Sequence, residues 1–217
     1  MVVVPPRMTL IELVKLDQDM LTRAQREMLY LAEHFMTKYH DGQVRATGEP
    51  YHEHLIKSYF VIRQLGLPFP TQPATLMHDS VEDCKEITYA FLLRHFRPRR
   101  IADLVNAVTK YDENSYFPQM EQAVYKRHLW ETIFIKNSDR LDNVNTVDGF
   151  TDIARRIRFL EETLGPLADL NSVCRPSIPQ RFLFAFDELT ESVLTLAQDK
   201  LSSNLADLIA QRATQGA

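Results

Sequence analysis

The chain has 217 residues and a formal net charge of −4, with 45% hydrophobic and 25% charged residues. These values are ordinary for a globular protein, and the length allows one domain with an appendage. The negative charge argues against broad nucleic-acid binding, which needs a basic surface. The two cysteines, Cys84 and Cys174, form neither a CxxC pair nor a disulfide framework.

The N-terminal sequence MVVVPPRMTL lacks the basic segment and the long apolar segment of a signal peptide. No apolar run approaches the roughly 20 residues that a membrane-spanning helix needs. We therefore expect a cytoplasmic protein with no membrane partner.

Apolar residues recur at three- and four-residue steps along most of the chain, which predicts an all-α fold. The first stripe predicts a helix over residues 21–40, followed by the loop DGQVRATGEPY. A second helix is expected over residues 53–65. A short third helix is expected to carry the stretch ATLMHDSVEDC.

The second half of the chain continues the helical pattern. We expect a helix over residues 101–108, a long helix over 119–146, and a helix over 153–164 that the Gly-Pro pair at 165–166 stops. After the loop NSVCRPSIPQ, heptad-like spacing predicts a final helix over 182–196, packed on the body rather than on a partner helix. The sequence has no GxGxxG or GxxxxGK[ST] motif, so dinucleotide-binding and P-loop folds lose their main support.

The stretch ATLMHDSVEDC places His78, Asp79, Glu82 and Asp83 within six positions, directly after an apolar run. On a helix, His78 and Glu82 would share one side, and so would Asp79 and Asp83. Burying such groups is costly unless their charge is compensated. Imidazole and carboxylate ligands suit a divalent ion such as manganese, iron or zinc. The alternative is the solvated face of an amphipathic helix, because a His-Asp pair is common by chance.

Two distant residues could complete a metal site with His78 and Asp79. His54 lies in GEPYHEHLIK, and Asp139 follows an apolar run in IFIKNSDRLDN. Together they would supply four ligands and leave room for water and substrate. His52 is the rival of His54, although the spacing from the preceding tyrosine favours His54.

These motifs together resemble the hydrolase domain of the RelA/SpoT family, a branch of the HD-type metal-dependent phosphohydrolases. The matching segments occur in the family's order and are GQVRATGEPYHEH, HDSVEDC, VNAVTKYDE, IKNSDRLDNVNT and RIRFLEETLGPLADL. The resemblance covers about residues 20–170. It implies an HD-domain helical bundle over residues 1–170, with a C-terminal helical extension over 171–217 that packs on the same domain.

The resemblance also implies an activity and its residues. Members of the family remove pyrophosphate from the ribose 3′ position of the alarmone ppGpp, the nucleotide of the stringent response, usually with Mn²⁺. The implied metal ligands are His54, His78, Asp79 and Asp139; the implied catalytic residues are Glu82 and Asp83; and the implied substrate contacts are Arg45 against the guanine, with Asn143 and Thr146 at the nucleoside. Since few residues follow position 170, we expect a stand-alone hydrolase of the small alarmone hydrolase type.

Several positions depart from the family's pattern. Ala46 stands where Lys or Ser is frequent, Leu55 where Pro is common, Cys84 where Thr is usual and Asp142 where His is usual, while Asn137-Ser138 replaces Leu-Ala. These changes weaken the prediction of the substrate more than the prediction of a metal-dependent hydrolase. Two alternatives stay open: an HD phosphohydrolase acting on another nucleotide, such as a nucleoside phosphate or NADPH, and a non-enzymatic nucleotide-binding module. The sequence predicts no oligomeric state.

Overall fold

The fold was obtained as a computed structural model, which describes residues 20–112 and 115–215. The segment MVVVPPRMTL and Glu113 of VNAVTKYDE lie outside the described residues. Within the described part of the chain the fold is helical, and the extended pairing is confined to an isolated bridge between Val44 and Pro50. The predicted all-α class is therefore confirmed.

The helices follow one another with short connections. In chain order they are α2 (Arg23–Tyr39), α3 (Tyr51–Gln64), α4 (Thr71–Leu76), α5 (Ser80–Asp83), α6 (Tyr89–His95), α7 (Arg100–Val108), α8 (Tyr116–Arg127), α9 (Glu131–Asn145), the 3₁₀ turn η1 (Val147–Gly149), α10 (Ile153–Glu162), the π turn η2 (Thr163–Leu167), α11 (Ala168–Cys174), the 3₁₀ turns η3 (Arg175–Ser177) and η4 (Gln180–Phe182), and α12 (Leu183–Gln215).

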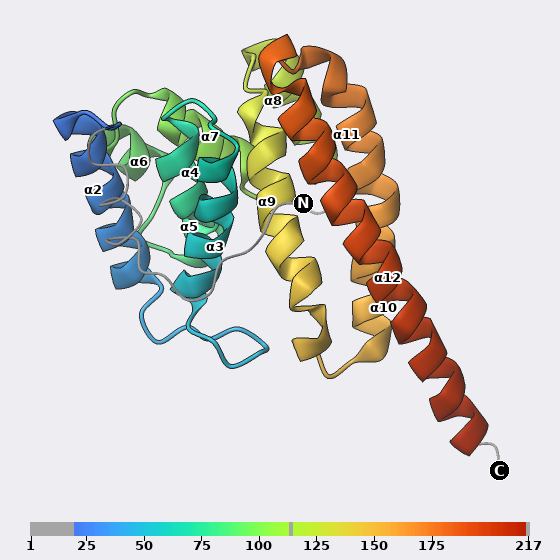
Figure 1. Ribbon diagram of the computed structural model, residues 1–217. Helices are drawn as coiled ribbons and strands as arrows, with labels where there is room; N and C mark the ends of the chain where they lie inside the picture. The colour runs from blue at the N-terminus through green and yellow to red at the C-terminus, as the bar shows by residue number, and fades with distance from the viewer. Residues whose placement is uncertain (1–19, 113–114, 216–217) are drawn as a thin grey trace.

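Helix α9 lies at the centre of the molecule, between two groups of helices (Figure 1). The helices from α2 to α7 stand on one side, around buried side chains such as Leu29 and Phe96. The helices from α10 to α12 stand on the other side, where Phe134 of α9 packs edge-on against Phe186 of α12. Because α9 is covered from both sides, its polar residues must find partners inside the protein.

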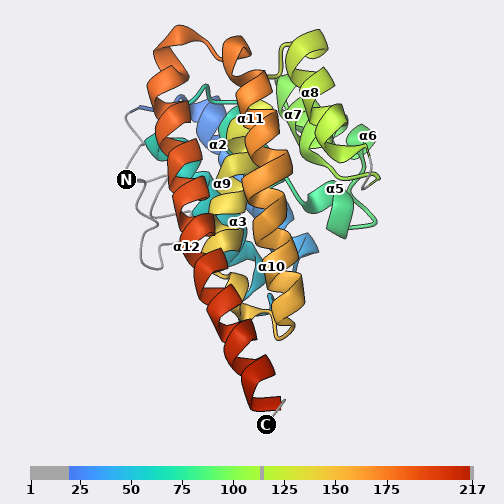
Figure 2. The same ribbon diagram turned by 90° about the vertical axis from the view of Figure 1, so that its right-hand side faces the viewer.

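The C-terminal helix α12 packs along α9 and α10 (Figure 2). Its buried residues Phe186, Leu189, Val193 and Ala197 recur at three- and four-residue steps and form one apolar stripe. The far end of α12 extends past the other helices. The division into two parts after residue 170 stays a prediction; residue 170 itself lies within α11.

The predicted long helix over 119–146 is wrong, because α8 and α9 are separate. His128 adopts a left-handed conformation, with φ of 54°, and ends α8. The N–H of Leu129 then donates to the carbonyl of Ala123 at 3.1 Å and so satisfies one of the carbonyls at the end of α8. Leu129 is buried in the core, so the apolar stripe continues across the break and hides it from periodicity analysis.

The prediction that the Gly-Pro pair at 165–166 stops a helix is also wrong. The chain passes from α10 through the π turn η2 into α11, and Figure 2 shows them following one line. Pro166 lacks the N–H that an α-helix interior needs, and a π turn absorbs that lost bond locally. The loop predicted from residue 171 starts later, since α11 ends at Cys174.

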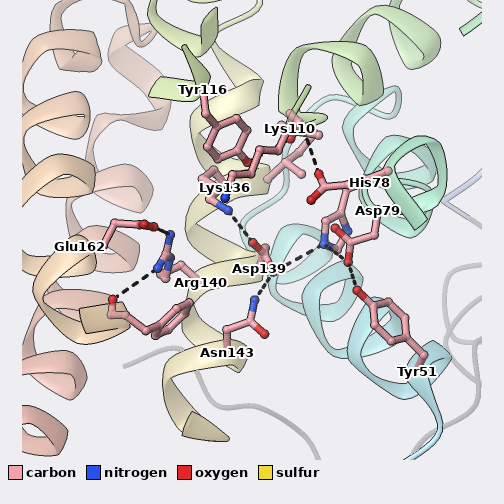
Figure 3. Close-up of a pocket in the computed structure, with 14 residues that line it drawn as sticks. Tyr51, His78, Asp79, Lys110, Tyr116, Lys136, Asp139, Arg140, Asn143 and Glu162 are labelled. Carbon is pink, nitrogen blue, oxygen red and sulfur yellow. Dashed lines mark hydrogen bonds and ion pairs between the residues drawn. The ribbon is translucent and has the colours of Figure 1, made fainter. Parts of the chain in front are cut away.

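The His-Asp pair lies in a turn rather than inside the predicted short helix. Helix α4 ends at Leu76 and α5 begins at Ser80, so His78 and Asp79 connect the two. The helical pairing expected for His78 with Glu82 therefore does not apply. The turn instead directs the side chains of His78 and Asp79 toward α9 (Figure 3).

The loop between α2 and α3 folds back on itself and reaches η1. Its residues Arg45 and Gly48 close a tight turn, in which the Gly48 N–H donates to the Arg45 carbonyl at 2.9 Å. At Gly149 of η1, an added Cβ atom would come within 2.7 Å of the Thr47 side chain, so this contact needs glycine. None of the described helices combines the length and apolar character that a bilayer crossing requires.

Candidate metal centre and cleft

Two imidazoles meet at the junction of α3, α9 and the turn between α4 and α5. His54 projects from α3 and His78 from the turn, and their ring centroids are 5.4 Å apart. Both side chains are almost completely buried. An imidazole in such a position requires a polar partner for each ring nitrogen.

Two carboxylates from other segments face these imidazoles. The Oδ1 atom of Asp139 on α9 lies 3.2 Å from His54 Nε2 and 3.6 Å from His78 Nε2. The Oδ2 atom of Asp79 lies 3.2 Å from His78 Nε2 and 3.8 Å from His54 Nε2. Donor atoms of His54, His78 and Asp139 all lie within 4.8 Å of one another, and His52 is not part of this group. The structure therefore brings together the four residues predicted as ligands.

The Nδ1 atom of each imidazole contacts an oxygen atom of a neighbouring residue. The Nδ1 atom of His54 lies 2.7 Å from Oδ2 of Asp142, and Nδ1 of His78 lies 2.7 Å from the carbonyl oxygen of Thr75. Partners of this kind fix an imidazole with Nδ1 protonated and Nε2 free to bind a metal. The Nε2 atom of His78 is buried without a hydrogen-bond partner, as expected of a nitrogen that binds a metal ion. The donor set thus fits a divalent cation.

The electrostatics of the cluster favour positive charge. Burial lowers the pKa of His54, but its hydrogen bonds to Asp139 and Asp142 outweigh burial and raise this pKa above the usual value. Burial raises the pKa of Asp79, but the facing His78 outweighs it and lowers the pKa to about 2. The pKa of Asp139 is likewise held well below its usual value, chiefly by Lys136 and the two imidazoles against the effect of burial. The same field would attract a divalent cation.

A cleft of about 250 Å³ opens beside this cluster. Lys136, Asp139, Arg140 and Asn143 recur at helical spacing on α9 and line it together (Figure 3). Lys136 Nζ donates to Asp139 Oδ2 at 2.9 Å, and Arg140 pairs with Glu162 at 2.5 Å. The cleft therefore presents cations, carboxylates and the imidazole of His78 within one concave site, an arrangement suited to a phosphorylated ligand.

The two predicted catalytic carboxylates lie at different places. Glu82 is exposed and lines the cleft, where its Oε2 accepts from the backbone N–H of Lys110 at 2.9 Å. Asp83 is not among the residues that line the cleft. Although both side chains are exposed, the surrounding protein partly desolvates them and raises the pKa of both carboxyls, and the charge of nearby Asp79 adds to the effect.

Of the predicted substrate contacts, Arg45 and Asn143 lie beside the metal cluster. Arg45 pairs with Asp142, and its second guanidinium nitrogen donates to Asn143 Oδ1 at 2.5 Å. Asn143 in turn donates to Asp139. Thr146 lies at the end of α9, where its hydroxyl donates to the carbonyl of Asp142 at 2.8 Å.

Sequence reasoning missed three residues that hold the ligands in place. Tyr51 donates from its hydroxyl to Asp79 Oδ2 at 2.8 Å, Thr75 accepts from His78, and Asp142 contacts His54. Tyr51 precedes His54 by three residues on α3, and that spacing could have pointed to it. The positions of Thr75 and Asp142 depend on how separate elements pack, and no local pattern reveals that.

Known proteins share this arrangement of sequence and fold. A family model described as "HD domain" matches residues 32–165. A guanosine-3′,5′-bis(diphosphate) 3′-pyrophosphohydrolase of Aquifex aeolicus is 35% identical over 151 residues, which cover 66% of this chain and 21% of that protein. The bifunctional (p)ppGpp synthase/hydrolase SpoT of Escherichia coli is 33% identical over 140 residues, which cover 59% of this chain and 20% of SpoT.

A solved structure has the same fold. It is that of a metazoan ortholog of SpoT reported to hydrolyse ppGpp; it matches with a TM-score of 0.57 and 19% identity, over 79% of this chain and 96% of the other. The chain spans about a fifth of the length of the curated relatives it matches. The family match covers more than half of the chain and includes the converging histidines and aspartates, so the protein belongs to the HD domain family.

Proposed function

We propose that this chain is a metal-dependent phosphohydrolase that removes pyrophosphate from the 3′ position of guanosine-3′,5′-bis(diphosphate). The observation that carries the proposal is the convergence of His54 Nε2, His78 Nε2 and the Asp139 carboxylate, with the outer nitrogen of each imidazole already held. The names of the Aquifex relative and of the metazoan structure support the choice of substrate.

The proposed ligands of the cation are His54, His78, Asp79 and Asp139. Imidazole nitrogen and carboxylate oxygen suit Mn²⁺ among the divalent ions, and we propose manganese as the native metal. A divalent cation at this site would lower the pKa of a bound water and neutralise charge on the phosphoryl oxygens. Tyr51 and Asp142 keep Asp79 and His54 turned toward it.

Glu82 is the proposed base for the water, because it lines the cleft one short turn after Asp79. Its raised pKa brings the carboxyl closer to neutral pH, where a carboxylate can take a proton and return it. The water oxygen bonds to the phosphorus nearest the ribose, the bond from that phosphorus to the 3′ oxygen breaks, and the 3′ oxygen receives a proton. Asp83 is proposed to assist this proton transfer from outside the cleft.

The substrate side of the proposal involves the cations of the cleft. Lys136 and Arg140 line the cleft and could meet the substrate's phosphates, and each already shares its charge with a carboxylate. Arg45 is proposed to lie against the guanine, since a planar guanidinium stacks on a purine. Asn143 and Thr146 are proposed to contact the nucleoside.

The test is a substrate panel with and without Mn²⁺. Purified protein would be incubated with ppGpp, simple nucleoside phosphates and NADPH, and the products separated by chromatography. We expect GDP and pyrophosphate from ppGpp, and no product after chelation of the metal. Faster turnover of another nucleotide would replace ppGpp as the substrate. A protein that binds Mn²⁺ and turns over no nucleotide would instead favour the non-enzymatic module.

The cytoplasmic location stays a prediction.

A further inference from the structure

Asp142 stands directly behind His54 and departs from the residue that the resemblance led us to expect. Its side chain is 2% exposed, and its Oδ2 atom lies 2.7 Å from His54 Nδ1. His78 has a different support, the neutral backbone carbonyl of Thr75. One of the two converging imidazoles is therefore backed by a negative charge and the other is not.

The Asp142 carboxylate is itself held by two cations. Arg45 pairs with its Oδ2 atom, and Lys57 Nζ lies 3.9 Å from its Oδ1 atom. Lys57 also pairs with Glu49 of the 41–50 loop, at 2.9 Å. A buried carboxylate with these neighbours keeps its charge and has little freedom to turn away from His54.

The position of the proton on His54 decides what Asp142 does. If Nδ1 carries the proton, it donates to Asp142 and Nε2 points its lone pair at Asp79 and Asp139. The Nη1 atom of Arg45 lies 3.3 Å from the same Nδ1 and could donate to it instead, which would leave the proton on Nε2. The shorter contact to a charged acceptor favours the first arrangement.

We propose that Asp142 is a positioning residue for metal binding, which holds His54 with Nε2 toward the cation and ties Arg45 of the 41–50 loop to the same imidazole. The inference rests on the metal site of the proposed function. A carboxylate behind a ligating imidazole fixes its orientation and makes it a better electron donor. Loss of the carboxylate should therefore lower the affinity for the metal, and not only the stability of the fold.

The experiment is a Mn²⁺ titration of chelator-treated protein, followed by the electron paramagnetic resonance signal of free Mn²⁺. Asp142→Asn keeps the size of the side chain and removes its charge. Asp169→Asn makes the same charge change at an exposed position on α11 and serves as the control. We expect the dissociation constant to rise about 10- to 100-fold in Asp142→Asn, the usual cost of losing such a partner, and to change less than about twofold in Asp169→Asn.

A second measurement needs no variant, in case Asp142→Asn does not fold. In wild-type protein loaded with diamagnetic Zn²⁺, long-range ¹H–¹⁵N spectra report which nitrogen of His54 carries the proton. We expect a slowly exchanging proton on Nδ1, and a proton on Nε2 would overturn the inference.

The outcomes separate this inference from the proposed function. Equal Mn²⁺ affinity in wild type and folded Asp142→Asn would overturn the role of Asp142 and leave the metal site intact. A wild-type protein that binds no divalent ion would overturn both.

Discussion

The Nε2 atom of His54 on α3 lies 3.2 Å from the Oδ1 atom of Asp139 on α9, although the two residues are 85 positions apart in the sequence. Both side chains are buried, so this contact depends on the packing of α3 against α9. A histidine and an aspartate from the two sides of one interface make metal binding a property of the folded chain.

Replacing Asp79 by alanine tests the proposed ligand set. The side chain is partly exposed and contacts both imidazoles and the Tyr51 hydroxyl. We expect Asp79→Ala to lower Mn²⁺ occupancy and to reduce turnover by roughly two orders of magnitude or more. Metal analysis after gel filtration measures the occupancy, with Asp169→Ala as the exposed control. Full occupancy in Asp79→Ala would remove this residue from the ligand set.

Replacing Glu82 by glutamine should separate chemistry from metal binding. Glu82 accepts a hydrogen bond from the Lys110 backbone, which an amide oxygen can also accept, so the local fold is kept. We expect kcat to fall about 10²- to 10⁴-fold, the usual contribution of a general base, with Mn²⁺ affinity unchanged. If the metal is lost together with activity, Glu82 is a ligand and the division of roles is wrong.

Replacing Arg45 by alanine should chiefly raise the KM for a purine nucleotide, measured at saturating Mn²⁺. It should also lower the free energy of unfolding by about 1–3 kcal/mol, because Asp142 is buried and loses its closest cation. Urea unfolding gives the second quantity. Arg45→Lys keeps the charge and should restore much of the stability while failing to restore the KM. An unchanged KM in Arg45→Ala would exclude Arg45 from substrate binding.

The buried pair of Asn137 and Asn171 predicts a non-additive effect on stability. Each side chain donates to the other, at 2.8 and 2.9 Å, across the contact between α9 and α11. Either single change to leucine leaves one buried amide without its partner, which should cost about 1–3 kcal/mol. The double variant should cost less than the sum of the two single changes, measured by urea unfolding. Additive losses would show that the two amides do not stabilise each other.

The pair of Asp148 in η1 with Lys200 in α12 predicts a pH dependence of stability. Burial raises the pKa of Asp148, but the hydrogen bond and charge of Lys200 outweigh it, so this pKa lies below the usual value. The pair therefore stabilises the fold above the unfolded pKa of about 3.9, and this contribution is lost as the pH falls through the folded pKa.

We expect Lys200→Met to lower the free energy of unfolding by about 0.5 kcal/mol at pH 7, a modest value because both groups are partly exposed. The loss should be smaller at pH 3. Lys126→Met, at an exposed position on α8, is the control and should show no such pH dependence. An equal or larger loss at pH 3 would contradict the assignment.

The sequence allowed the helical class and several helices to be predicted, because their apolar stripes begin and end within one element. The helices over residues 21–40 and 53–65 correspond closely to α2 and α3. Periodicity failed where the apolar stripe crosses a change of direction, as at His128, and where the chain absorbs a helix-breaking residue, as at Pro166. Packing decides both cases.

The candidate site was predicted unevenly for a related reason. The residue types and spacing of His54, His78, Asp79 and Asp139 pointed to a metal site, and the structure brings these four side chains together. The contact of Asp142 with His54 could not be predicted, because it exists only after α3 has packed on α9. From the sequence alone, Asp142 was only a departure from the histidine that is usual at this position in the family.

An anomalous difference map from crystals of the wild-type protein soaked in Mn²⁺ would show directly whether the four side chains bind one cation. We expect one strong peak within bonding distance of His54 Nε2, His78 Nε2 and the carboxylates of Asp79 and Asp139. A peak bound elsewhere, with these four side chains left without a cation, would contradict this prediction.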